Sequence, residues 1–273
     1  MLNNRWYQKH VKKSILKYKI KKQKFVDGQH KMIGVNLRRY IHPFLRKILH
    51  IRNKLYGITY EIYGCKLPLD KKESIIYALT HIGKFDFEVF MDACNVFCYP
   101  VAGDWDLMYG EIDDYFLRLN GVLYVDTDDK VDRKYTNYAM NKMLLQGISI
   151  LIYPEGVWNF TECLPMMNIF PGTVRTAKET KVPIIPVAIE QEGKHFCVNI
   201  GERFYVNGDI KSENERLRDT MATLQWNNWE HLSKLQRAEI SDNYYDNFIQ
   251  IKLAEWPKYN MEIIKKRIYN DKT

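Results

Sequence analysis

Short apolar runs alternate with amphipathic segments through the middle of the chain, from about residue 58 to residue 236. The runs predict strands at 58–64, 74–80, 96–102, 121–126, 148–153, 182–190 and 195–204. The segments between them predict helices at 87–95, 132–147, 172–180 and 212–235, the last opened by a Ser212-x-x-Glu215 capping box. This alternation predicts an α/β fold, with a central mixed, largely parallel sheet flanked by helices.

The segment before residue 57 has a different pattern, which predicts basic helices. Apolar residues recur at helical spacing between residues 36 and 56, and basic residues occupy the opposite face. The apolar stripe consists of Leu37, Ile41, Phe44, Leu45, Ile48 and Leu55, and the basic face of Arg38, Arg39, Arg46, Lys47, Arg52 and Lys54. Pro43 is expected to weaken or kink this helix. The stripe could lie in a membrane interface or pack on the domain's own core, and we favour the core.

Charge divides the chain into three parts: a basic helical segment at 1–56, a domain at 57–236, and a basic, aromatic extension at 237–273. Residues 1–60 hold 16 Lys and Arg but one acid, Asp27, within a net charge of +8. Such a block suits an anionic membrane or nucleic acid. We expect a membrane surface, bound in a salt-sensitive way, and no nucleic acid.

The cysteines and apolar runs indicate a cytoplasmic protein, peripheral on the inner face of a membrane. Five cysteines occur without a C-x-x-C pair, which predicts reduced thiols and neither a disulfide framework nor a zinc site. The acidic run 126–132 lacks the glycine and glutamate of a calcium loop. No apolar run is long enough to span a bilayer. We therefore expect no metal.

One pair of residues suggests catalytic chemistry. His81 follows the buried strand at 74–80, and Asp86 falls in the first turn of the next helix. A histidine in that loop can fold back onto the carboxylate, which would fix the imidazole tautomer and leave the other nitrogen as a base. The pair would also lie at the carboxyl edge of the sheet, where α/β proteins build their sites. A lone His-x4-Asp arises easily by chance, so the surrounding sequence has to decide.

Further blocks accompany this pair in a fixed order. Gly64-x-x-Leu67-Pro68 leads into it, and it is followed by GVLYVD at 121–126, YPEG at 153–156 and VPIIPVA at 182–188. Over about residues 58–225 the order and spacing resemble the glycerolipid acyltransferase family, which includes the lysophosphatidic acid (1-acylglycerol-3-phosphate) acyltransferases.

The resemblance implies transfer of a fatty acyl group from acyl-CoA or acyl carrier protein to a hydroxyl of a lysophospholipid or related lipid. His81 would be the general base and Asp86 would orient it, with no acyl-enzyme intermediate and no cofactor. The implied substrate-binding residues are Glu155, Gly156, Val157, Trp158, Gly121 and Pro186. For Gly121, Gly156 and Pro186, a tight turn or a strand shape is the competing explanation.

The chain also departs from the family pattern. Val157, Trp158 and Asn159 stand where the family usually has Thr, Arg and Ser, and Thr127 stands where it has a basic residue. These basic positions are associated with an acceptor phosphate. The alternatives are therefore a glycolipid or other non-phosphate acceptor stacked on Trp158, and an amine or polyketide-like acceptor. An inactive scaffold that binds anionic membrane or nucleic acid is a further alternative.

Overall fold

A computed structural model describes residues 5–30, 35–67, 73–103, 105–161, 164–232, 243–256 and 261–262. The strands are β1 (Thr59–Gly64), β2 (Ile76–Leu79), β3 (Tyr99–Ala102), β4 (Leu123–Tyr124), β5 (Ile150–Ile152), β6 (Ile184–Glu192) and β7 (His195–Ile200). The helices are α1 (Arg5–Val26), α2 (Val35–Tyr56), α3 (Asp86–Cys94), α4 (Trp105–Met108), α5 (Ile112–Asn120), α6 (Lys130–Leu145), α7 (Gly172–Thr180), α8 (Ile210–Leu232) and α9 (Tyr244–Glu255). Every strand predicted from the sequence is present, although most are shorter than the apolar runs.

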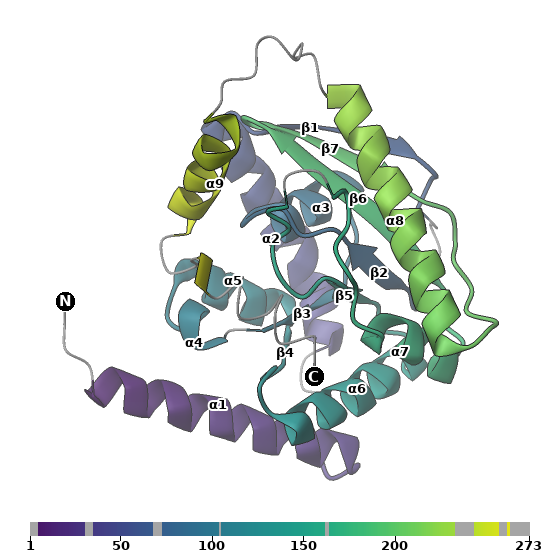
Figure 1. Ribbon diagram of the computed structural model, residues 1–273. Helices are drawn as coiled ribbons and strands as arrows, with labels where there is room; N and C mark the ends of the chain where they lie inside the picture. Colours follow the sequence, from purple (N-terminus) through teal and green to yellow (C-terminus); the bar gives the residue numbers. More distant parts are fainter. Residues whose placement is uncertain are drawn as a thin grey trace.

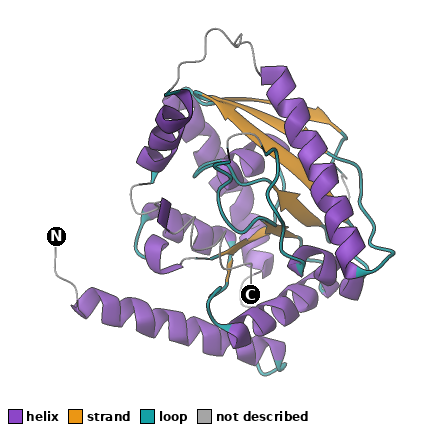
Figure 2. Cartoon of the chain, in the orientation of Figure 1, coloured by secondary structure: helices purple, strands orange, loops and turns teal. Residues whose placement is uncertain are grey.

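The strands form one sheet in the order β1-β7-β6-β2-β5-β3-β4. All neighbours are parallel except β6 and β7, which form a hairpin through a turn with Gly193 in the left-handed region. The predicted mixed, largely parallel sheet flanked by helices is confirmed (Figure 1; Figure 2).

Alternate residues of the central strands supply two separate cores, one on each face of the sheet. Ile76 and Ala78 of β2 point to the face covered by α6, α7 and α8. Tyr77 and Leu79 point to the other face and pack with Phe90 of α3 and Leu49 of α2. Both faces are therefore buried, which explains why the central apolar runs are continuous.

The N-terminal helix α1 is attached to the domain through its lysines. Lys22 is buried against α6, where its Nζ donates to Asp132 Oδ2 at 2.8 Å and to Thr136 Oγ1 at 2.7 Å. Lys19 Nζ lies 2.6 Å from Asp126 Oδ2 and 2.9 Å from Asp129 Oδ2. The acidic run at 126–132 therefore binds lysines of the chain itself, and part of the basic block is not available to an external surface.

Only part of the predicted apolar stripe of α2 lies against the domain: Leu45 is buried and Ile41 is half-buried. The buried face consists of His42, Leu45, Leu49 and Asn53, whereas Leu37, Tyr40, Phe44, Ile48, Ile51 and Leu55 are exposed. The expectation that the apolar stripe packs on the core was therefore wrong for Leu37, Phe44, Ile48 and Leu55 and holds for Leu45. The helix runs through Pro43 as a single element.

The physical reason for this orientation is polar pairing across the α2 interface. Arg52 donates to Glu88 at 2.7 Å and Arg38 donates to the carbonyl oxygen of Arg118 at 3.2 Å. Asn53 Nδ2 donates to Asp92 Oδ2 at 3.0 Å. These polar interactions with α3 and α5 thus outweigh the free energy that burying the stripe would give. Hydrophobic periodicity within α2 carries no information about them.

A second correction concerns the start of α8. The helix begins at Ile210, and Asp209 caps it by accepting hydrogen bonds from the backbone N–H groups of Lys211 and Ser212, each at 3.0 Å. Ser212 is therefore inside the first turn, and the predicted capping box was placed too late. Asp209 satisfies the same N-terminal donors, because aspartate is as good an N-cap as serine.

Candidate active site

The site lies where the parallel strands β2 and β5 end at the same edge of the sheet. His81 follows β2 after one residue, and Tyr153 follows β5 directly. Asp86 is the first residue of α3 and is fully buried. The sequence prediction that a strand end and a helix start would bring His81 and Asp86 together agrees with this geometry.

Asp86 holds both the imidazole and the loop that carries it. His81 Nδ1 lies 2.8 Å from Asp86 Oδ2. The same oxygen accepts the backbone N–H groups of Ile82 at 2.9 Å and Gly83 at 3.1 Å. A carboxylate accepts hydrogen bonds, so Nδ1 carries the proton and the lone pair of the neutral ring is on Nε2. This arrangement suits a general base.

Aromatic rings hold the His81 imidazole on two sides. The Tyr153 ring stacks on it with centroids 3.8 Å apart and an interplanar angle of 17°. The Trp158 indole stands edge-on to it, with centroids 5.9 Å apart. Burial raises the pKa of the Tyr153 hydroxyl well above its usual value, so this ring stays neutral. Sequence reasoning missed the role of Tyr153, although its position next to Pro154 and Glu155 could have indicated it.

Glu155 and Gly156 form a tight turn beside the imidazole loop. Gly156 has a φ of +69°, and a Cβ there would come within 2.8 Å of the Phe170 ring, so the turn requires glycine. Glu155 is buried and its Oε1 accepts the backbone N–H of Met167 at 2.9 Å. Burial raises the pKa of Glu155 to about 8, which that hydrogen bond only partly offsets. The side chain is therefore largely protonated at neutral pH.

Val157 and Trp158 are in the interior of the domain. Trp158 is 1% exposed and packs against Phe160 and Trp256, which follows α9. The hypothesis that Trp158 offers an open face to a sugar ring does not fit this position. The indole lies roughly perpendicular to the His81 imidazole, with centroids 5.9 Å apart, so Trp158 packs beside the candidate base.

Helix α9 covers this region from the C-terminal extension. Its Ile249 joins a cluster with Val157, Trp158 and Phe160. The last turn of α9 lies close to Gly83 in the loop between His81 and Asp86. A Cβ added to Gly83 would come within 3.2 Å of Glu255 Oε2 and 3.4 Å of Lys252 Nζ, both on α9. The basic, aromatic composition of 237–273 was noticed in the sequence, but its contact with the His81–Asp86 loop was not predicted.

Gly121 and Pro186 pack against neighbouring strands and side chains within the domain. Gly121 ends α5 at a φ of +105°, and a Cβ there would come within 2.4 Å of the Tyr99 ring. Pro186 is buried inside β6, paired with Ala78 of β2, and its carbonyl oxygen accepts the N–H of Gly201 at 2.9 Å. No contact among the described residues joins either one to His81, so packing explains both as readily as substrate binding.

Two of the described cysteines, Cys94 and Cys98, lie in surroundings that disfavour the thiolate. Cys65, Cys94, Cys98 and Cys197 are free thiols, and Cys163 lies outside the described residues. Burial raises the pKa of Cys94 to about 12 and that of Cys98 further. Thiols in this state are poor nucleophiles.

Comparisons with known proteins agree with the geometry. Residues 62–190 match the family described as Acyltransferase. An uncharacterized acyltransferase of Schizosaccharomyces pombe is 24% identical over 148 residues, which is 52% of this chain and 53% of the relative. The 1-acyl-sn-glycerol-3-phosphate acyltransferase of Saccharomyces cerevisiae is 24% identical over 149 residues, 53% of this chain and 47% of the relative. The chain thus spans about half the length of these relatives.

A solved structure shares the fold. The 1-acyl-sn-glycerophosphate (LPA) acyltransferase PlsC of Thermotoga maritima superposes with a TM-score of 0.58, covering 83% of this chain and all of that chain. The sequence identity is 12%, so this likeness shows the fold alone.

Proposed function

Because residues 62–190 match the family described as Acyltransferase, we propose that the chain transfers a fatty acyl group from a thioester to a lipid hydroxyl. The donor would be acyl-CoA or acyl carrier protein, and the acceptor a lysophospholipid or related lipid. The observation that carries the proposal is the 2.8 Å contact from Asp86 Oδ2 to His81 Nδ1, at the strand edge where α/β domains bind ligands.

In the proposed reaction His81 acts as a general base. Nε2 takes the proton of the acceptor hydroxyl as its oxygen attacks the thioester carbonyl carbon. The C–O bond forms, the C–S bond breaks, and the proton passes from Nε2 to the leaving sulfur. Buried Asp86 stabilises the imidazolium that forms between these steps, and the Tyr153 ring keeps the imidazole in position.

The acceptor has two competing descriptions. The name of the Saccharomyces cerevisiae relative supports a glycerol phosphate acceptor. The absence of basic residues at Thr127 and at 157–159 supports a non-phosphate acceptor such as a glycolipid. Lys130, Arg133, Lys134 or Arg175 could supply the missing positive charge instead. Arg175 lines a hollow together with Lys211 and Arg218. Lysophosphatidate is the first acceptor to assay, with a glycolipid and an amine acceptor beside it.

We also propose that the protein works at the surface of a membrane, where its lipid substrates reside. Among the described residues no helix is long and apolar enough to cross a bilayer. The exposed apolar face of α2 suits insertion at an interface, and exposed lysines of α1 suit anionic headgroups. On this proposal the protein is peripheral on the cytoplasmic face, and attachment combines both contributions.

The test is acceptor-dependent thiol release from long-chain acyl-CoA and from acyl carrier protein. His81→Ala is expected to lower the rate by ~10³-fold or more, because the base is removed. His50→Ala is the matched control, since His50 also contacts a buried carboxylate, Asp92, at 3.3 Å but lies on α2. An unchanged rate in His81→Ala would disprove the proposed mechanism. If the wild-type chain releases no thiol with any of these acceptors, a scaffold that binds without catalysing would be favoured.

A further inference from the structure

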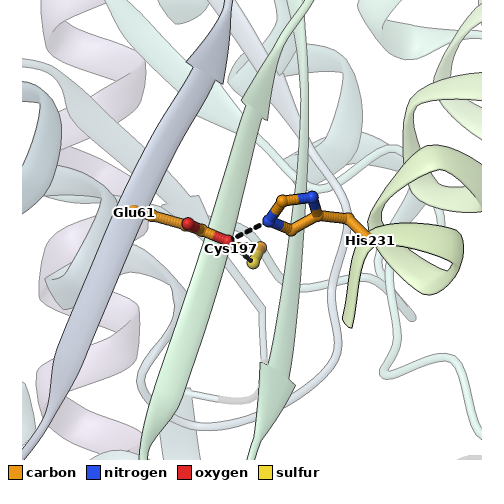
Figure 3. Close-up of side chains that lie close together, drawn as sticks. All are labelled: Glu61, Cys197 and His231. Atoms are coloured by element: carbon orange, nitrogen blue, oxygen red, sulfur yellow. Dashed lines mark hydrogen bonds and ion pairs between the residues drawn. The ribbon is translucent and has the colours of Figure 1, made fainter. Parts of the chain in front are cut away.

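A second cluster of reactive side chains lies on the edge of the sheet formed by β1 and β7. Glu61 of β1 and Cys197 of β7 are direct partners in the parallel register, and His195 precedes Cys197 by two residues. Residues two apart on a strand face the same side, so these three side chains share one face. The last turn of α8 adds His231 to this face (Figure 3).

The Glu61 carboxylate is the centre of this cluster. Its Oε1 lies 2.9 Å from Cys197 Sγ and 3.7 Å from His195 Nε2, and it is in direct contact with His231 Nε2. His195 Nε2 lies 4.0 Å from Cys197 Sγ. The candidate ligand atoms of Glu61, Cys197 and His231 all lie within 4.8 Å of one another.

These separations fit the geometry of a small tetrahedral metal site. Metal–ligand bonds of about 2.0–2.3 Å place tetrahedral ligand atoms about 3.3–3.8 Å apart. The separations among the ligand atoms of Glu61, Cys197 and His231 extend to either side of that range, so movements of about 1 Å or less at the ends of these three side chains would suffice. His195 Nε2, which lies 3.7 Å from Glu61 Oε1 and 4.0 Å from Cys197 Sγ, is the candidate fourth ligand. One sulfur, two imidazole nitrogens and one carboxylate oxygen form a donor set that suits Zn²⁺ rather than the oxygen-seeking Ca²⁺ or Mg²⁺.

We propose that Glu61, Cys197, His231 and His195 bind one Zn²⁺ ion, with four protein ligands in a structural site. A thiolate and a carboxylate together balance the charge of the ion, and both imidazoles bind neutral. The site would join the C-terminal end of α8 to the edge strand β1, which is far from α8 in sequence. It is built on β1, β7 and α8, whereas His81 follows β2 and Asp86 opens α3.

Neighbouring groups already orient the proposed ligands. Thr59 Oγ1 lies 2.9 Å from His195 Nδ1, which leaves Nε2 directed at the cluster. The Tyr63 ring lies against the His231 imidazole with centroids 5.2 Å apart, and the Tyr63 hydroxyl donates to Asn228 one turn earlier on α8. Partners of this kind fix the ring orientation at histidine metal sites.

The burial of the cluster also suits metal binding. Cys197 is fully buried, whereas the side chains of Glu61, His195 and His231 are 42%, 39% and 51% exposed. The thiolate would therefore be shielded while the ion enters from the solvent side. Without metal, the thiol and imidazole N–H groups donate to Glu61, so the ion replaces these protons and its affinity should fall as the pH is lowered.

The test uses the full chain prepared without a histidine tag, freed of metal with a chelator and titrated first with Co²⁺ and then with Zn²⁺. The expected result is one equivalent of Co²⁺ with an intense thiolate charge-transfer band and the visible bands of a tetrahedral site. Zn²⁺ should displace it with a submicromolar Kd. Cys197→Ser should abolish the charge-transfer band, and Cys65→Ser, which changes a thiol outside the cluster, should leave it intact.

His231→Ala provides a second variant in case Cys197→Ser fails to fold, because His231 is half exposed. It should weaken Zn²⁺ binding ~100-fold or more and remove the increase in melting temperature that Zn²⁺ gives the wild-type chain. Absence of a cobalt band at one equivalent, persistence of the band in Cys197→Ser, or unchanged Zn²⁺ affinity in His231→Ala would each overturn the proposal.

Discussion

At the residue scale, Glu155 has an environment far from that of an ordinary surface carboxyl. It follows Tyr153 and Pro154 into the turn beside His81, and it is 3% exposed. Its pKa is raised from 4.5 to about 8, chiefly because burial disfavours the charged form. Between these two values the native state holds a proton that the unfolded state has lost.

This protonation predicts that the native state becomes less stable as pH rises. Between about pH 5 and pH 8, each rise of one pH unit should lower the free energy of unfolding by up to about 1.4 kcal/mol, because the native state keeps the Glu155 proton that the unfolded chain loses. Glu155→Gln is neutral at all pH values and should lack this contribution. Urea denaturation at pH 5, 6, 7 and 8 would measure the difference. Glu215→Gln, at an exposed position of α8, is the control, and parallel pH profiles for wild type and Glu155→Gln would contradict the prediction.

At the element scale, the attachment of α1 to α6 includes one buried ion pair. The side chains of Lys22 and Asp132 are each 2% exposed, and Asp132 Oδ2 also accepts the backbone N–H of Asp126. Removing the lysine leaves the carboxylate buried without its cation, which typically costs about 3–5 kcal/mol.

Lys22→Met is therefore expected to destabilise the domain strongly, or to release α1 from α6. Lys21→Met is the matched control, because Lys21 is its exposed neighbour on the same helix. Thermal unfolding reports the loss of stability, and hydrogen exchange in α1 reports its release. Equal behaviour of the two variants would show that the ion pair has no role in holding α1.

At the scale of the whole molecule, the orientation of α2 decides how the protein would meet a membrane. Phe44 and Ile48 are 64% and 46% exposed, one turn apart on the outward face. Each such side chain contributes about 1.5–3 kcal/mol when it moves from water into an apolar environment. Attachment should therefore be partly hydrophobic, and not purely electrostatic as the sequence suggested.

The corresponding experiment is sedimentation with anionic vesicles at low and high salt. High salt should weaken binding by screening the lysines but should not abolish it. A Phe44→Glu, Ile48→Glu double variant should bind at least about tenfold more weakly, whereas Leu145→Glu, at an exposed apolar position of α6, should bind normally. Complete loss of wild-type binding in high salt would show that the apolar face does not contribute.

Features that depend on residues close together in the sequence could be predicted from it, and features that depend on residues far apart could not. Runs such as 74–80 and 148–153 are apolar on both faces, so the central parallel strands could be predicted without a partner. His81 and Asp86 are five residues apart, and the strand–loop–helix between them brings them together locally. Strand order and the covering of the site by α9 involve residues far apart in sequence, and no local pattern encodes them.

Hydrophobic and polar periodicity by itself determined the α/β class, the strands and the helices α3, α6, α7 and α8, because these depend on neighbours within about one strand or one helical turn. The short spacing of His81 and Asp86 likewise brought that pair together locally. Helices α4, α5 and α9 were not predicted. Only the tertiary structure decided which face of α2 is buried, since paired arginines outweighed the apolar stripe. Only it placed Trp158 in the interior. It alone brought Glu61, Cys197 and His231 together, because β1 and β7 are adjacent in the sheet while their residues are far apart in the chain.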